Sequence, residues 1–242
     1  MIFLRSAIFY VGFYVLLALF LILGSPLLLM SRISAIRGLQ AWGRTLNGML
    51  RVICGIKVEI RGLDKVPEGP LLVVGKHQST WETFALPVLF DDPCMVEKKE
   101  LFYIPVFGWP WTYKFRMIGV VRSAGPKALK DLIKRAKEEA AMGRQIIILP
   151  EGTRKAVGAP LDYKPGAAAL YTQLNLPCIP FGLNAGLFWG RRMFLKRPGT
   201  IVLEFGEVIP PGLPRKDFDK RMQDEIESIT NRLIAESQQI RS

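Results

Sequence analysis

The sequence of 242 residues predicts an α/β fold, with a largely parallel central sheet flanked by helices and an N-terminal membrane-embedded helical segment. Two observations favour this class. Beyond Gly55, short apolar runs alternate with stretches of helical periodicity, as parallel strands joined by helices do. Before that point lies an uncharged run long enough to cross a bilayer. We therefore expect membrane-anchoring helices over residues 1–54 and one α/β domain over residues 55–242.

The N-terminal run has no charged residue from Ser6 to Met30, roughly 25 positions, which can span a bilayer. Arg5 precedes the run and several arginines follow it, so the positive-inside rule places the bulk of the chain in the cytoplasm. A weak basic start and the lack of a small-residue cleavage site argue against a cleaved signal peptide. The Gly-Ser-Pro run at 24–26 interrupts the apolar stretch, because proline breaks the helical hydrogen-bond ladder. A kinked span and a helix–turn–helix in one leaflet are both compatible with this pattern.

From Arg32 to Ile53 the pattern becomes amphipathic. The residues that share the apolar side are Ile36, Leu39, Leu46, Leu50 and Ile53, and those that recur every seven positions on another side are Arg37, Arg44 and Arg51. One interpretation is an interfacial helix with its arginines at lipid phosphates. The other is a helix packed on the core of the domain.

The remaining elements follow from apolar runs bounded by turn residues and from helical periodicity. The predicted strands are 56–60, 71–75, 94–97, 118–121, 145–149, 178–183 and 200–205. The predicted helices are 81–90, 126–142, 166–174 and 216–236. Strands and helices alternate along most of this stretch, which is why we expect the sheet to be largely parallel.

Composition excludes several classes of site. The net charge of +12 favours anionic partners such as nucleic acid, acidic membranes or acidic carrier proteins. We exclude nucleic acid as a partner because no zinc-ligand pairing and no RNA-binding signature occurs, whereas the apolar N-terminus indicates a membrane. Cys54, Cys94 and Cys178 are dispersed, which argues for a reducing compartment and against a disulfide framework or zinc site. With a single histidine we expect no metal site.

The only histidine, His77, directly follows the strand predicted to end at residue 75, where open α/β sheets carry their ligand crevice. The next helix begins with Ser79 or Thr80 as its N-cap and has Glu82 in its first turn. Residues five apart in one helix are separated by about 140° around its axis, so His77 and Glu82 can meet only if His77 lies in the turn before the helix. The carboxylate would then fix the tautomer of the ring and stabilise the imidazolium. The alternatives are a structural histidine and an acid that only complements the helix N-terminus.

Three further segments place a cation or a turn just beyond a strand end. They are Lys98 to Trp109, Ile118 to Arg122 and Leu149 to Arg154. The planar fork of arginine suits phosphate because it donates two hydrogen bonds at once, and lysine supplies a mobile point charge. The alternative for each segment is an ordinary solvated cation.

In this order, these segments resemble the conserved blocks of the glycerolipid acyltransferase family, and specifically of bacterial 1-acyl-sn-glycerol-3-phosphate acyltransferases. The histidine–x4–acid block matches residues 77–82, the second block 98–122, the third 150–154 and the fourth 179–181. The resemblance covers about residues 55–210. Two positions depart from it: Glu82 stands where the family most often has aspartate, and Lys76 where asparagine is common.

The resemblance implies a membrane-bound O-acyltransferase that moves an acyl chain from acyl-CoA or acyl-carrier protein to the free hydroxyl of 1-acyl-sn-glycerol-3-phosphate, giving phosphatidic acid. It implies that His77 is the general base, that Glu82 orients it, and that transfer is direct. No cofactor is expected, because thioester attack needs none. The implied location is the bacterial inner membrane, with the catalytic domain on the cytoplasmic side.

The resemblance also assigns residues to the binding of the substrate phosphate. The cations that would hold it are Lys98, Arg122 and Arg154. The loop that presents Arg154 is shaped by Glu151, Gly152 and Thr153, which belong to the same binding site. The sequence assigns no oxyanion donor, and backbone N–H groups near His77 are candidates. The run at 188–192 is either a second interfacial patch, aromatic beside basic, or a loop between two strands. Rival functions are the same chemistry on another lysolipid, such as a lyso-ornithine lipid, and a non-catalytic membrane lipid-binding protein.

Overall fold

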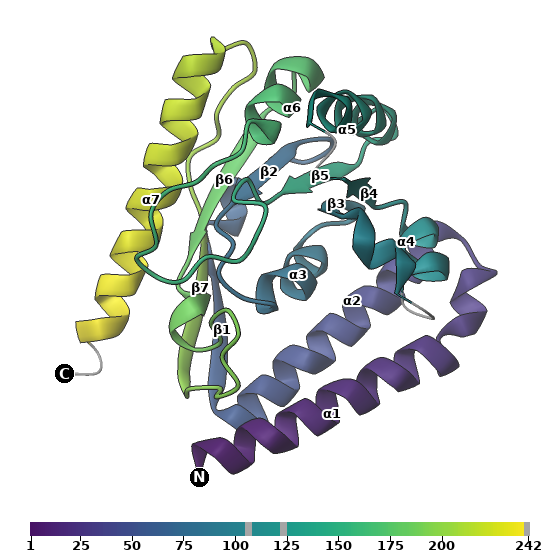
Figure 1. The fold of residues 1–242 in the computed structure, drawn as a ribbon, viewed down its shortest axis with the longest axis vertical. Coiled ribbons are helices and arrows are strands. Elements are labelled where there is room, and N and C mark those ends of the chain that lie inside the picture. The colour runs from purple at the N-terminus through teal and green to yellow at the C-terminus, as the bar shows by residue number, and fades with distance from the viewer. Residues whose placement is uncertain (105–107, 122–124, 240–242) are drawn as a thin grey trace.

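The computed structural model describes residues 1–104, 108–121 and 125–239, and its centre is one seven-stranded sheet (Figure 1). The strands are β1 (Ile56–Arg61), β2 (Leu72–Gly75), β3 (Pro93–Lys98), β4 (Ile118–Val120), β5 (Gln145–Ile148), β6 (Cys178–Leu183) and β7 (Gly199–Phe205). Their order across the sheet is β1-β7-β6-β2-β5-β3-β4, and only β6 and β7 pair antiparallel. The prediction of a largely parallel sheet flanked by helices is therefore confirmed.

Helices cover both faces of the sheet, in two groups (Figure 1). They are α1 (Ile2–Leu23), α2 (Arg32–Met49), α3 (Trp81–Ala85), α4 (Trp109–Phe115), α5 (Gly125–Ala140), α6 (Gly166–Leu174) and α7 (Arg215–Gln239). The central strand β2 shows why both faces are covered: Leu72 and Val74 pack in the cluster of α5, α6 and α7, and Val73 packs in the cluster of α1 to α4. Side chains alternate between the faces of a strand, so a strand that is apolar throughout needs cover on both.

The first two helices form a hairpin (Figure 1). Helix α1 ends at Leu23, and a 3₁₀ turn over Ser25–Leu28 follows, with Pro26 in its first turn. Ser31 then caps α2, its side-chain oxygen accepting the N–H of Ser34 at 3.1 Å. Of the two arrangements compatible with the sequence, the structure therefore has the helix–turn–helix.

Helix α1 is long and apolar enough to cross a membrane, with a mean hydropathy of 2.5. Its inner side packs on the domain, where Phe9 is fully buried and its ring centroid lies 5.4 Å from that of Trp189. A buried lysine strengthens this contact: Lys196 donates its backbone N–H to the hydroxyl of Ser6 and its ammonium to the hydroxyl of Tyr10, both at 2.8 Å. The outer side of α1 is exposed along its whole length.

Burial of Trp189 bears on the run at 188–192. Phe188 and Trp189 are both buried, whereas Arg191 and Arg192 are exposed. Of the two interpretations, the aromatic interfacial patch is wrong for these two rings, because both are buried and Trp189 packs against Phe9 of α1. The segment is a loop between β6 and β7.

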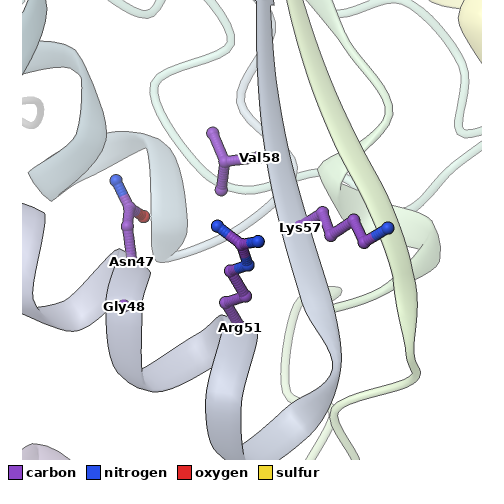
Figure 2. Close-up of a pocket in the computed structure, with 5 residues that line it drawn as sticks. All are labelled: Asn47, Gly48, Arg51, Lys57 and Val58. Carbon is purple, nitrogen blue, oxygen red and sulfur yellow. The ribbon is translucent and has the colours of Figure 1, made fainter.

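The apolar side of α2 packs on the domain, with Ile36, Leu46 and Leu50 fully buried. The three arginines on its other side, Arg37, Arg44 and Arg51, are exposed. Beyond Met49 the helix widens into a π-helical turn over Leu50–Cys54, which ends at Gly55 with φ +69°. Beside this turn, a hollow of about 400 Å³ lies between the end of α2 and β1, and Figure 2 shows Asn47, Arg51 and Val58 around it.

Two helices differ from the sequence prediction. The predicted helix 81–90 is α3 followed by a 3₁₀ turn over Leu86–Leu89, because Pro87 has no N–H to continue the ladder. Helix α4 was not predicted. It has only seven residues and carries Pro110 in its first turn, so its sequence is too short to show helical periodicity.

Candidate active site

The loop between β2 and α3 places His77 and Glu82 in contact. Strand β2 ends at Gly75 and α3 begins at Trp81, so His77 lies in the turn before the helix, as their spacing requires. Nδ1 of His77 is 2.8 Å from Oε1 of Glu82. The glutamate is fully buried, and the side chain of His77 is 14 % exposed. The longer glutamate therefore reaches the ring.

One oxygen of Glu82 accepts three hydrogen bonds. Besides the ring of His77, Oε1 accepts the backbone N–H of Gln78 at 2.8 Å and of Ser79 at 2.7 Å. These N–H groups lie in the loop just before α3, and Glu82 itself lies in the first turn of the helix, where a negative charge is favourable. The carboxylate thus binds the histidine and complements the helix N-terminus at the same time.

The contact with Glu82 sets the chemistry of the ring. A carboxylate only accepts hydrogen bonds, so Nδ1 of His77 carries the ring proton and Nε2 carries the lone pair. Nε2 has no hydrogen-bond partner among the residues that the structure describes, and the ring lines a cavity. This arrangement leaves a basic nitrogen facing the cavity and a carboxylate that would stabilise the imidazolium.

A second buried carboxylate holds the backbone of the same loop. Glu151, 1 % exposed, accepts the backbone N–H of His77 at 2.8 Å. Its other oxygen lies 3.1 Å from the ammonium of Lys76, which also pairs with Glu227 of α7 at 2.6 Å. Tyr163 donates its hydroxyl to Glu227 at 2.6 Å. Burial raises the pKa of Glu151, and the charge of Lys76 opposes this shift.

These bonds bear on the candidate oxyanion donors. The backbone N–H groups of His77, Gln78 and Ser79 all donate to the carboxylates of Glu151 and Glu82. These three groups are therefore not free to act as oxyanion donors, because each already has a carboxylate partner.

The turn after β5 is joined to the loop of His77. Gly152 adopts a φ of +63°, which favours glycine, and its N–H donates to the carbonyl of Leu149 at 2.9 Å. The N–H of Lys155 donates to the carbonyl of His77 at 2.8 Å. Arg154 donates to the side-chain oxygen of Thr80. The first and third sequence blocks are thus one hydrogen-bonded unit.

The fourth block lies in β6, beside β2. The backbone N–H of Lys76 donates to the carbonyl of Phe181 at 3.4 Å. Gly75 packs against the ring of Phe181, where a Cβ would lie 2.3 Å from a ring carbon. Only glycine allows the strand to approach the ring this closely at the point where the histidine loop begins.

A cavity of about 460 Å³ adjoins His77. Lys98, Gly152, Thr153 and Arg154 also line it, so predicted residues from the three blocks meet there. Its apolar walls come from α1, α2, α3, α4 and β3, and include Phe13, Phe20, Trp42, Phe84, Met95, Trp111 and Phe115. The cavity therefore joins cations and a base to a largely apolar interior.

Of the predicted phosphate-binding residues that the structure describes, only Glu151 is not part of this cavity lining. Arg122 lies outside the described residues. Glu151 is turned toward Lys76 and the backbone of His77, where it holds the loop that carries the cation Arg154. Sequence reasoning missed the partners of Lys76, because Glu227 lies 151 residues further along the chain and nothing in the local pattern connects them. Among the described residues, no group of three potential ligands could hold a metal ion.

Comparison with known proteins agrees with this arrangement. A family model described as "Acyltransferase" matches residues 57–184. The chain is 40% identical over 170 residues to a 1-acyl-sn-glycerol-3-phosphate acyltransferase of Pseudomonas aeruginosa, a match that covers 70% of this chain and 66% of that protein. It is 29% identical over 135 residues to the enzyme of the same name from Saccharomyces cerevisiae, covering 54% of this chain and 44% of the yeast protein. The chain thus spans less than two thirds of the length of these relatives.

One solved structure is similar over almost its whole length. It is the crystal structure of PlsC, the 1-acyl-sn-glycerophosphate (LPA) acyltransferase from Thermotoga maritima, with a TM-score of 0.77 and 20% sequence identity. The match covers 96% of each chain, so the likeness of fold includes the N-terminal helix hairpin.

We predict that Lys76→Met destabilises the protein by about 3–5 kcal/mol, because it leaves two carboxylates beside the loop without their cation. Lys155→Met is the matched control. It removes a more exposed ion pair with Asp162, and we expect a loss of only about 0–1 kcal/mol. Denaturant unfolding of the two purified variants measures both values. Equal stability of the two variants would show that the Lys76 pairs do not hold the loop.

Proposed function

The chain belongs to the acyltransferase family, and from this premise we propose that it is a membrane-bound 1-acylglycerol-3-phosphate O-acyltransferase. Its acceptor is the free hydroxyl of lysophosphatidic acid, its donor is acyl-CoA or acyl-carrier protein, and its product is phosphatidic acid. The observation that carries the proposal is the position of His77, which Glu82 holds on the wall of a cavity. Cations line one part of this cavity, and most of its other lining side chains are apolar. The names of the relatives support the same reaction.

In this mechanism, Nε2 of His77 takes the proton of the acceptor hydroxyl while the hydroxyl oxygen attacks the thioester carbonyl. The carboxylate of Glu82, 2.8 Å from Nδ1, stabilises the imidazolium that forms. The tetrahedral intermediate then expels the thiolate, which recovers the proton from Nε2. The oxygen–acyl bond replaces the sulfur–acyl bond in one transfer, with no acyl-enzyme.

The substrate has an anionic head and apolar chains, and the cavity offers a place for each. Arg154 and Lys98 are the described cations that would hold the phosphate, with Gly152 and Thr153 beside them. The aromatic and aliphatic walls suit an acyl chain. Arg122 stays a predicted phosphate ligand. Glu151 acts in this proposal by fixing the loop.

Helix α1 suits a membrane-bound enzyme, since its inner side lines the cavity and its outer side exposes apolar residues. Phe13, Leu17 and Phe20 line the cavity, whereas Val11 and Ile22 are 66% and 65% exposed. We propose that the exposed side enters the lipid, so that an acyl chain passes from the bilayer to His77 without crossing water. The location in this proposal is the bacterial inner membrane, with the catalytic domain in the cytoplasm.

A thiol-release assay with purified full chain tests reaction, donor and acceptor together. Acyl-CoA or acyl-carrier protein is mixed with lysophosphatidic acid, and the lipid product is identified by mass spectrometry. We expect phosphatidic acid and free thiol in equal amounts. A preference for lyso-ornithine lipid would make the acceptor wrong, and lipid binding without thiol release would show a non-catalytic lipid-binding protein.

We predict that His77→Ala lowers the rate of this reaction by about 10²–10⁴-fold, since general base catalysis contributes that much. The chain has no second histidine that could replace it. The measurement is single-turnover product formation, with thermal unfolding as the check that the variant folds. Full activity in folded His77→Ala would rule out the assigned base.

We predict that Arg154→Ala raises the KM for lysophosphatidic acid about tenfold or more, because it removes a charge-assisted hydrogen bond to the phosphate. The KM for a phosphate-free monoacylglycerol should change little. Arg215→Ala removes the same kind of side chain from the exposed start of α7 and is the control. If Arg154→Ala affected both acceptors equally, its phosphate role would be wrong.

A further inference from the structure

A carboxylate lines the cavity together with apolar side chains. Glu97 is on β3, and it lines the same cavity as its strand neighbours Met95 and Val96. Trp111 and Phe115 of α4 also line this cavity. The proposed mechanism gives Glu97 no role, although its side chain lies in the space where an acyl chain would bind.

Glu97 has no hydrogen bond or ion pair to any residue that the structure describes. Burial raises the pKa of its carboxyl to about 7, and no charge among the described residues contributes to this shift. Four threonines line the cavity, and three of them have other partners: Thr83 donates to the carbonyl of Thr80 at 2.7 Å, Thr112 donates to the carbonyl of Gly108, and the hydroxyl of Thr80 accepts from Arg154. The carboxyl of Glu97 is therefore available to interact with a ligand that binds in the cavity.

The charged or titratable side chains that share the cavity with Glu97 are His77, Lys98 and Arg154. His77 is bonded to Glu82, and Arg154 to Thr80. The described residues of α1, α2, α3 and α4 that line the cavity are all uncharged. Among the described residues, a chain that enters the cavity thus meets uncharged, mostly apolar groups on the helices and one carboxyl on the sheet.

We propose that Glu97 is a specificity-determining residue for the acyl chain: it disfavours plain hydrocarbon chains that reach its carboxyl and favours chains that place a hydroxyl beside it. This inference rests on the proposed function of the cavity. Methylene groups packed over an unpartnered carboxyl remove its access to water and give no hydrogen bond in return, which is costly. A hydroxyl can both donate to the carboxyl and accept from it, so it offsets that cost.

The first experiment compares wild-type protein with Glu97→Met, which keeps a side chain of similar length but removes the carboxyl. The donors are saturated acyl thioesters of graded length and their hydroxyacyl counterparts, with lysophosphatidic acid as acceptor. For chains that reach Glu97, we expect the wild type to prefer the hydroxylated donor by about tenfold in kcat/KM, the effect of one hydrogen bond at a buried site. We expect Glu97→Met to lose this preference and to use plain chains about tenfold better. Identical donor profiles in the two proteins would overturn the proposal.

Short-chain donors that stop before Glu97 are the internal control, and both proteins should use them equally. Glu100→Gln, an exposed acid beyond the end of β3, is the matched variant and should keep the wild-type profile. A binding readout separates this proposal from the proposed reaction. Trp42 and Trp111 line the cavity, so their fluorescence reports occupancy by free fatty acids without turnover. A hydroxyl preference in binding that disappears in Glu97→Met supports the inference even if the acceptor proves to be different, and its absence contradicts it.

The pH dependence of binding gives a second readout. An ionised carboxylate is harder to cover than a neutral carboxyl, so discrimination against plain chains should grow as the pH rises through about 7, where the pKa of Glu97 lies. Glu97→Gln keeps a polar amide that cannot ionise in this range, and its discrimination should not change with pH. Because His77 is present in both proteins, the difference between their pH profiles isolates Glu97. Parallel pH profiles would contradict the proposal.

Discussion

The geometry of the site depends on one buried oxygen, Oε1 of Glu82. It accepts hydrogen bonds from the ring of His77 and from two backbone N–H groups of the loop just before α3, at 2.7–2.8 Å. Because the helix fixes the carboxylate and the carboxylate fixes the ring, Nε2 of the histidine faces the cavity without further support. The extra methylene of glutamate is accommodated, since the histidine lies before the helix and the acid within its first turn.

The order of strands explains why distant blocks of sequence meet at this histidine. Strand β2 pairs in parallel with both β5 and β6, so the carboxyl ends of the three strands lie side by side. Glu151 follows β5 and bonds the backbone of His77, while Lys76 reaches from the same loop to Glu227 on α7. The C-terminal helix and the loop that carries His77 are thus joined by a buried ion pair, which costs desolvation and is stable only while all partners are present.

Local pattern was sufficient to predict the strands, the long helices and the contact between His77 and Glu82, because each depends on periodicity or on spacing within a few residues. It was not sufficient for α4, whose seven residues include a proline. Nor could it connect Lys76 with Glu227, or show that α1 and α2 close the cavity, because these contacts arise only when the sheet brings remote segments together. Glu97 appeared in the sequence as the last residue of a predicted strand, and only the fold shows that it lies in an apolar cavity.

The central claim is that Glu82 holds His77 with its proton on Nδ1 and its lone pair on Nε2. The chain contains one histidine, so protein expressed without a histidine tag and labelled with ¹⁵N-histidine has a single imidazole to observe. We predict that NMR of the neutral ring shows a protonated Nδ1 and a bare Nε2, and that Glu82→Ala abolishes this preference. A neutral ring protonated on Nε2 in the wild-type protein would contradict the account, because no basic nitrogen would then face the cavity.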